Sequence, residues 1–172
     1  MTAVGLRITP VNATCDFMTA GRKTIFVNIG KEIPDTKSMK KAELEKTVQE
    51  RIVTLGVVTM SHLGSEFLLS VTQSTERRFT RQECIAAVSL RVKEIAAMGA
   101  TVDAGLLSPD GLKKKCRNFL RYCLETKILS EDGRGRYTVT LREPGTLRYP
   151  GFKAFPVRHS VNDLNSLLEW YA

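Results

Sequence analysis

The chain has 172 residues, of which 42% are apolar and 26% charged, a composition typical of globular rather than disordered proteins. Its length suits one compact domain or two small ones, and allows a core that needs no disulfide or metal support. The four cysteines show no close pairing, and residues 1–10 lack the pattern of a secretory signal, so we expect a reducing, intracellular compartment. Lys and Arg exceed Asp and Glu by 26 to 18, and the net charge of +8 favours anionic partners.

An apolar stretch over residues 52–71 is about long enough to span a bilayer. It contains His62 and Glu66 near its middle, together with serines and glycines. A carboxylate near the bilayer centre costs at least ~2.5 kcal/mol on the most lenient scale. We therefore predict a buried helix in place of a transmembrane span, and any association with a membrane surface is expected to be peripheral.

The first third of the sequence predicts strands. An apolar run from Val4 to Cys15, interrupted at Pro10, precedes a β-rich run over residues 24–29. The segment between the two runs is short enough for a hairpin and also for a shortened crossover. Because proline supplies no N–H, Pro10 belongs at a strand end, at a bulge or on an edge.

Helical signals follow. From Ser38 the apolar residues repeat with helical period on one face, and a second helix is expected over residues 57–71. The sequence Thr80-Arg81-Gln82-Glu83 predicts a capping box, and its helix should run to Gly99. Ser108-Pro109 predicts another start, with the serine as N-cap, for a helix that ends near residue 127.

A β-hairpin is expected next, because Asp132-Gly133-Arg134-Gly135 predicts a turn and apolar residues alternate after it up to Leu141. The proline-containing region up to Arg158 is predicted to be irregular, and Ser160 is predicted to cap a last short helix.

The expected fold class is α+β. A small β segment over residues 1–36 precedes a helical domain over residues 37–143, which ends in a winged-helix-like helix plus β-hairpin. An irregular tail with a short terminal helix occupies residues 144–172.

The helix after Ser108 carries the clearest polar pattern, because its basic residues gather beside an apolar stripe that contains Cys116. The candidate anion-binding residues are Lys113, Lys114, Arg117 and Arg121 on this helix, and Arg134 and Arg136 in the hairpin. Three interpretations stay open: a solvated helix face, contact with anionic phospholipid or a phosphorylated substrate, and phosphate contacts of a winged helix with nucleic acid. No aromatic residues interleave with these charges, which disfavours recognition of RNA or single strands.

The histidines and cysteines predict no catalytic constellation, no metal site and no cofactor. His62 has Glu66 one turn later, but a metal site would need a further ligand, so a buried histidine with satisfied hydrogen bonds is favoured. His159 is expected in a polar loop. The cysteines, which lack the close pairs of zinc sites, are expected to be small core residues.

Several short motifs, taken in order, resemble the later half of glycerol-3-phosphate acyltransferases. The family's (I/V)-x-P-V strand is similar to Ile8-Thr9-Pro10-Val11, and its V-x-(F/I)-G-x-x-I segment is similar to residues 27–33. A V-T-rich helix resembles residues 57–70, and an (L/F)-(T/S)-R-x-E helix start resembles residues 79–83. The likeness spans about residues 6–139, and the last thirty residues are unmatched.

The resemblance implies that residues 1–36 end an acyltransferase-like sheet and that Thr9 and Pro10 border a substrate site. It also implies phospholipid biosynthesis at a membrane, with acyl-CoA or acyl-carrier donors. However, the family's H-x-x-x-x-D pair, in which histidine is the general base, is missing, because Phe67 stands five residues after His62 and Leu164 five after His159. The family's glycerol-phosphate motif is also missing.

The expected function is therefore a non-catalytic C-terminal portion, or a degenerate relative, of a glycerol-3-phosphate acyltransferase. Such a chain is expected to be inactive alone and to pair with the remainder of an acyltransferase domain or with another subunit. The alternatives are a winged-helix nucleic-acid-binding module and a scaffold subunit that makes protein contacts only.

Overall fold

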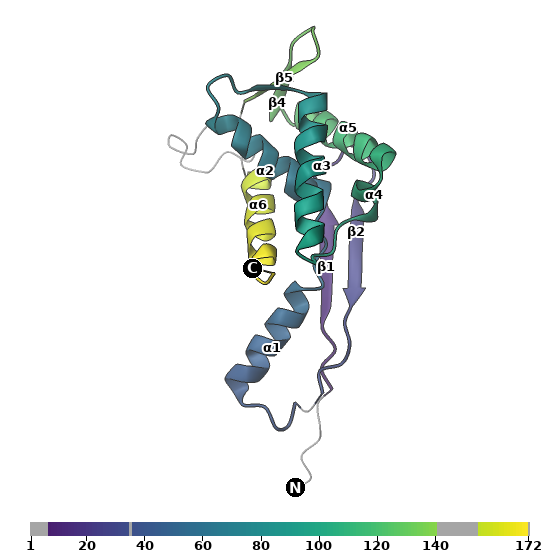
Figure 1. Ribbon diagram of the computed structural model, residues 1–172, viewed down its shortest axis with the longest axis vertical. Coiled ribbons are helices and arrows are strands. Elements are labelled where there is room, and N and C mark those ends of the chain that lie inside the picture. Colours follow the sequence, from purple (N-terminus) through teal and green to yellow (C-terminus); the bar gives the residue numbers. More distant parts are fainter. Residues whose placement is uncertain (1–6, 35, 141–154, 172) are drawn as a thin grey trace.

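The structure is a computed structural model that describes residues 7–34, 36–140 and 155–171 (Figure 1). An antiparallel hairpin comes first, formed by β1 (Val11–Asp16) and β2 (Thr24–Ile29). The helices are α1 (Lys41–Val53), α2 (Met60–Gln73), α3 (Arg81–Ala97), α4 (Ala104–Leu107), α5 (Pro109–Glu125) and α6 (Phe155–Leu168). A second, antiparallel sheet in the order β3-β5-β4 contains β3 (Arg78–Thr80), β4 (Leu129–Glu131) and β5 (Arg136–Val139). The α+β class, with a hairpin first and a helix plus hairpin after the central helices, is confirmed.

Helix α2 is the centre of the core, where it contacts α3, α5 and α6. Gly64 allows α5 to approach closely, because a Cβ atom at this position would lie 2.5 Å from the ring of Phe119. The fully buried side chains that surround this crossing come from all four helices and include Met60, Leu63, Leu68, Val88, Ile95, Phe119, Leu120 and Leu164. One hydrophobic core therefore joins α6 to the helices before it.

The second sheet covers one end of this core. Phe79 of β3 is buried, meets Phe67 edge to face with ring centroids 4.9 Å apart, and lies 5.5 Å from the Tyr137 ring. Successive side chains of a strand alternate between its faces, so Arg78 and Arg136 point away from the core. The order α5, β4, β5, with β5 paired to β3, gives the helix followed by a β-hairpin that the sequence predicts at this end of the chain.

Two helix starts follow the predicted capping signals. The Thr80 side chain accepts from the Glu83 N–H while the Glu83 carboxylate accepts from the Thr80 N–H, as a capping box requires. Ser108 caps α5 by accepting from the N–H of Gly111. α3 ends at Ala97, and Gly99 follows with a φ of +87°, the left-handed conformation that favours glycine.

The start of the last helix was predicted wrongly. α6 begins at Phe155, so Ser160 lies inside the helix, buried near the sulfur of Met18, and His159 is helical instead of lying in a loop. The physical reason is that Pro156 occupies the first turn, where the missing N–H breaks no helical hydrogen bond.

The apolar stretch over residues 52–71 is also not one helix. α1 ends at Val53, α2 starts at Met60, and Val58 between them forms a parallel bridge with Val102. Within the described ranges, no helix is long and apolar enough to cross a membrane. Of the sequence-based expectations, the start of the first apolar run (Val4 and Leu6), Leu141 and the irregular segment 144–154 lie outside the described residues.

Candidate functional site

The inner face of the β1–β2 hairpin is polar and is fastened to the helical part. Asn12 donates from Nδ2 to the carbonyl of Ile52 at 3.0 Å, and Asn28 donates to the carbonyl of Leu55 at 2.8 Å. Thr14 accepts the N–H of Val57 at its Oγ1 atom, at 3.1 Å. These bonds fix the sheet against the last turn of α1 and the segment that follows it, although their donors and acceptors are far apart in sequence.

The opposite face of the hairpin is apolar and exposed. The register places Val11 opposite Ile29, and Ala13 opposite Val27, so these side chains share one face with Ile25. The exposed fractions are 49% for Val11, 64% for Ile25, 62% for Val27 and 71% for Ile29. We call Val11, Ile25, Val27 and Ile29 the outer hairpin face. A sheet that packed only on its own chain would place its apolar side chains inward, so this face is the reverse of the usual arrangement.

The turn between β1 and β2 anchors the hairpin in the core. Met18 is fully buried, and its N–H donates to Ser61 Oγ at 2.9 Å. Ala20 donates its N–H to the carbonyl of Asn118 on α5 at 3.0 Å. Lys23 places its ammonium group over the ring of Tyr122, 4.6 Å from the centroid.

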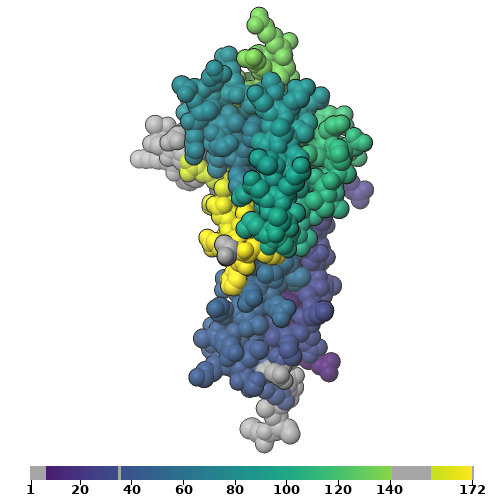
Figure 2. Space-filling model, viewed as in Figure 1, coloured from purple at the N-terminus to yellow at the C-terminus, as the bar shows by residue number. Residues whose placement is uncertain are grey.

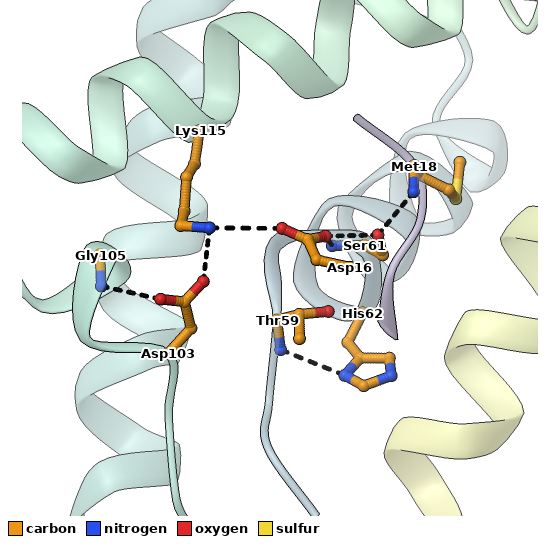
Figure 3. A network of polar contacts seen from close by, with 8 residues as sticks. All are labelled: Asp16, Met18, Thr59, Ser61, His62, Asp103, Gly105 and Lys115. Carbon is orange, nitrogen blue, oxygen red and sulfur yellow. Dashed lines mark hydrogen bonds and ion pairs between the residues drawn. The ribbon is translucent and has the colours of Figure 1, made fainter. Parts of the chain in front are cut away.

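A buried ionic network joins β1 to three helices (Figure 3). Asp16 is 2% exposed, and its Oδ1 atom accepts the N–H of Ser61 at 3.0 Å and the Ser61 hydroxyl at 2.6 Å. Its other oxygen lies 3.4 Å from Nζ of Lys115, which also lies 2.5 Å from Oδ2 of Asp103. Asp103 in turn accepts the N–H of Gly105 and so caps α4. The Asp16 carboxylate therefore caps α2 from a distant strand, where the helix dipole favours a negative charge.

This network is suited to holding elements together and not to acid–base chemistry. Burial opposes the positive charge of Lys115, but Asp103 and Asp16 outweigh this effect and raise the pKa of the lysine. Lys115 is consequently protonated at neutral pH and is not a nucleophile. The sequence analysis assigned none of the residues of this network to a functional site. Lys115 and Asp103 were not predicted as members of a site. The one indication in the sequence is that Lys115 lies next to Cys116, at the border of the apolar stripe of its helix.

A groove of about 380 Å³ lies between β1, the first turn of α2, and α6. Among its lining residues are Cys15, His62, His159 and Asp163. His62 is 4% exposed, and its Nδ1 atom accepts the N–H of Thr59 at 3.2 Å. Burial lowers the pKa of His62, so the ring is neutral and carries its hydrogen on Nε2. His62 thus offers a hydrogen-bond donor in place of the accepting nitrogen that a general base needs.

The remaining histidine contacts are those of surface and structural groups. His159 Nε2 lies 3.5 Å from a carboxylate oxygen of Asp163, and both side chains are about half exposed. Glu66, the considered metal partner of His62, instead forms an ion pair with Arg91 at 3.1 Å. In the part of the chain that the structure describes, no group of three His, Cys, Asp or Glu side chains could hold a metal ion.

The six predicted anion-binding residues lie on α5 and the β4–β5 hairpin, and we call them the cationic surface: Lys113, Lys114, Arg117, Arg121, Arg134 and Arg136. All six are exposed, and the hairpin projects from the end of the molecule above α5 (Figure 2). Thr9 and Pro10 are not brought to this surface. Thr9 is exposed, and Pro10 is buried against Gly30 at the start of β1, which lies toward the opposite end (Figure 1).

The cysteines are all free thiols. Cys84, Cys116 and Cys123 are buried, as expected for small core residues, whereas Cys15 is half-buried at the groove. The structure brings Cys84 and Cys116 together across α3 and α5, with their sulfurs 3.5 Å apart.

The chain matches no protein-family model, and no curated protein or solved structure is significantly similar to it.

Proposed function

We propose that this chain is the non-catalytic C-terminal portion, or a degenerate relative, of a glycerol-3-phosphate acyltransferase of phospholipid biosynthesis. Its part in that assembly is to supply β1 and β2 to the acyltransferase-like sheet and to pack the helices behind them. Thr9 and Pro10 at the start of β1 would then border the substrate site, while another segment supplies the histidine–aspartate pair.

The observation that carries this proposal is the outer hairpin face. A two-stranded hairpin is at best marginal in water, and an exposed apolar face of this kind marks a surface that another element covers. The inner face is already occupied by hydrogen bonds to the last turn of α1 and to the segment between α1 and α2. Further strands would pair with the outer edges of the hairpin, and a covering layer would pack on the face where Ile25 and Val27 are exposed.

The titratable side chains at the groove and in the ionic network are compatible with a chain that does not itself catalyse acyl transfer. The Nδ1 atom of His62 is occupied by the N–H of Thr59, so this nitrogen cannot accept a proton from a substrate. Lys115, which lies in the buried ionic network outside the groove, is held protonated by two carboxylates. Acyl transfer to a hydroxyl group needs a general base, and the remainder of the domain would supply that base.

The first experiment measures acyl transfer from acyl-CoA to glycerol 3-phosphate by the chain alone, and no turnover is expected. The chain is then mixed with an acyltransferase segment that carries an H-x-x-x-x-D pair and lacks its own late strands. Activity that depends on both partners supports the proposal. Turnover by the chain alone, or no gain in the mixture, counts against it.

A matched pair of variants tests whether the outer hairpin face is the contact. Ile25→Lys with Val27→Lys should abolish the gain in activity, because two buried charges would oppose packing. Leu90→Lys with Leu107→Lys makes the same change at two apolar residues, which are 61% and 59% exposed on α3 and α4, and should leave the gain intact.

A second candidate function is supported by one observation. The order α2, β3, α3, α4, α5, β4, β5 and the sheet order β3-β5-β4 are compatible with a winged helix, and the basic side of α5 is exposed. A nucleic-acid-binding module would show binding to duplex DNA that weakens steeply with salt. The slope should fall by about one for each phosphate-contacting residue removed.

A further inference from the structure

The cationic surface gathers much of the positive charge of the chain. Residues 109–139 contain eight Lys and Arg and four Asp and Glu, so this segment alone supplies half of the net charge of +8. Its acidic residues are mostly engaged locally. The Asp132 carboxylate accepts the N–H groups of Arg134 and Arg136, which lowers the pKa of Asp132, and Glu125 pairs with Arg121 at 2.9 Å.

The cationic side chains of this surface without an ion-pair partner in the described part of the chain lie in the middle of α5 and at the turn of the β4–β5 hairpin. Among the residues that the structure describes, no carboxylate lies within ion-pair distance of the side chains of Lys114, Arg117 or Arg134. The surface continues onto β3, because Arg78 stands opposite Thr138 and is therefore diagonal to Arg136 on the outward side of the sheet. Diagonal neighbours of this kind are about 7–8 Å apart.

We propose that the cationic surface, together with Arg78, binds the anionic phospholipid headgroups of a membrane surface. Phosphate groups are the natural counter-charge for lysine and arginine, and each such residue near an anionic membrane contributes roughly 1 kcal/mol, a fivefold change in affinity. The hairpin projects from the body of the molecule, so its arginines can reach a surface without rearrangement of the core (Figure 2).

The placement of acidic residues favours a membrane over the groove of a nucleic acid duplex. Asp110 and Glu125 stand at the two ends of the exposed side of α5, where they pair with Lys113 and Arg121. A helix inserted in a groove would hold both carboxylates between phosphate backbones. A membrane surface instead contacts only one side of the helix. The cations in the middle of α5 and the projecting hairpin would make this contact, and the two carboxylates would lie at its ends.

The test is flotation with vesicles of phosphatidylcholine alone and of phosphatidylcholine mixed with phosphatidylserine. The chain should bind only the mixed vesicles, and binding should weaken above about 0.1 M salt, where the screening length falls below ~10 Å. Lys114→Gln with Arg117→Gln and Arg134→Gln should weaken binding about tenfold or more. The matched control, Lys40→Gln with Lys46→Gln and Lys93→Gln, makes the same charge change at exposed lysines elsewhere and should change binding less than about threefold.

Circular dichroism checks that each variant is folded, and single variants at Arg117 and Arg134 give the same comparison if the triple variant is not. Equal loss in the control set, equal binding to neutral vesicles, or tighter binding to a short DNA duplex than to mixed vesicles would each overturn the proposal. This inference goes beyond the proposed function, and its readout does not use acyl transfer, so either one can fail without the other.

Discussion

The carboxylate of Asp16 and the ammonium group of Lys115 lie 3.4 Å apart, although the two residues are 99 positions apart in the chain. Their contact fixes the end of β1 against α5, and Asp103 completes it from the start of α4. The pairing connects the hairpin with the helices at a depth where water does not screen the charges well. It is the polar counterpart of the apolar anchor that Met18 provides in the adjacent turn.

Removal of the lysine should destabilise the fold strongly. Lys115→Met leaves Asp16 and Asp103 buried without their cation, and the free energy of unfolding should fall by about 3 kcal/mol. Urea denaturation measures this change. Lys113→Met, which breaks only an exposed pair with Asp110, should stay within about 0.5 kcal/mol. Adding Asp103→Asn to Lys115→Met should recover part of the loss, and the idea fails if the two single lysine variants behave alike.

His62 predicts a pH dependence of stability. Burial lowers the pKa of this histidine below its ordinary value of 6.5, against a smaller opposing effect of Asp163 and Asp16. Below pH 6.5 the His62 side chain binds a proton in the unfolded chain but not in the folded chain. The free energy of unfolding therefore decreases as the pH falls from 6.5 toward the pKa of His62 in the folded chain. The loss is at most about 1.4 kcal/mol per pH unit.

The measurement is the urea midpoint of wild type at pH 7.5 and at pH 5.5. His62→Gln should flatten this dependence, whereas His159→Gln, at a half-exposed position, should retain it. An undiminished fall in the His62→Gln variant would show that another group is responsible.

The crossing of α2 and α5 should not tolerate a methyl group at Gly64. A Cβ atom there would meet the Phe119 ring at 2.5 Å, so Gly64→Ala should lower the free energy of unfolding by about 1–3 kcal/mol through overpacking. Gly133→Ala is the matched control, because no atom lies within 4 Å of a Cβ built at that hairpin position. Thermal denaturation distinguishes the two, and equal melting temperatures would contradict this close approach of the helices.

Thiol labelling should distinguish the four cysteines. Cys15 is the only one that is not buried, so native protein should show one rapidly reacting thiol, which Cys15→Ser removes. The other three should react only after unfolding. Burial also raises the pKa of Cys123, which further slows its reaction. Two or more rapid thiols in the native state would show that the contact of α3 with α5 opens readily.

The local signals in the sequence predicted much of the helical part. The capping box at Thr80 and the Ser108-Pro109 start were found because a cap depends on residues within one turn of each other. The predicted start of α6 is wrong, since the prolines of the region up to Arg158 indicate an irregular segment, whereas Pro156 is compatible with a first helical turn. β3 was not predicted, because three residues are too few to show an alternating pattern.

The sequence by itself determined the α+β class, the basic side of α5 and the absence of an H-x-x-x-x-D pair, since each depends on residue types and short spacings. Only the tertiary structure decided that Asp16 meets Lys115, that Nδ1 of His62 is occupied by a backbone N–H, and that Ile25 and Val27 point to solvent. The physical reason is that a period of two shows which side chains share a strand face, but not which of the two faces the helices cover. That choice is made by the hydrogen bonds of Asn12 and Asn28 with residues far along the chain.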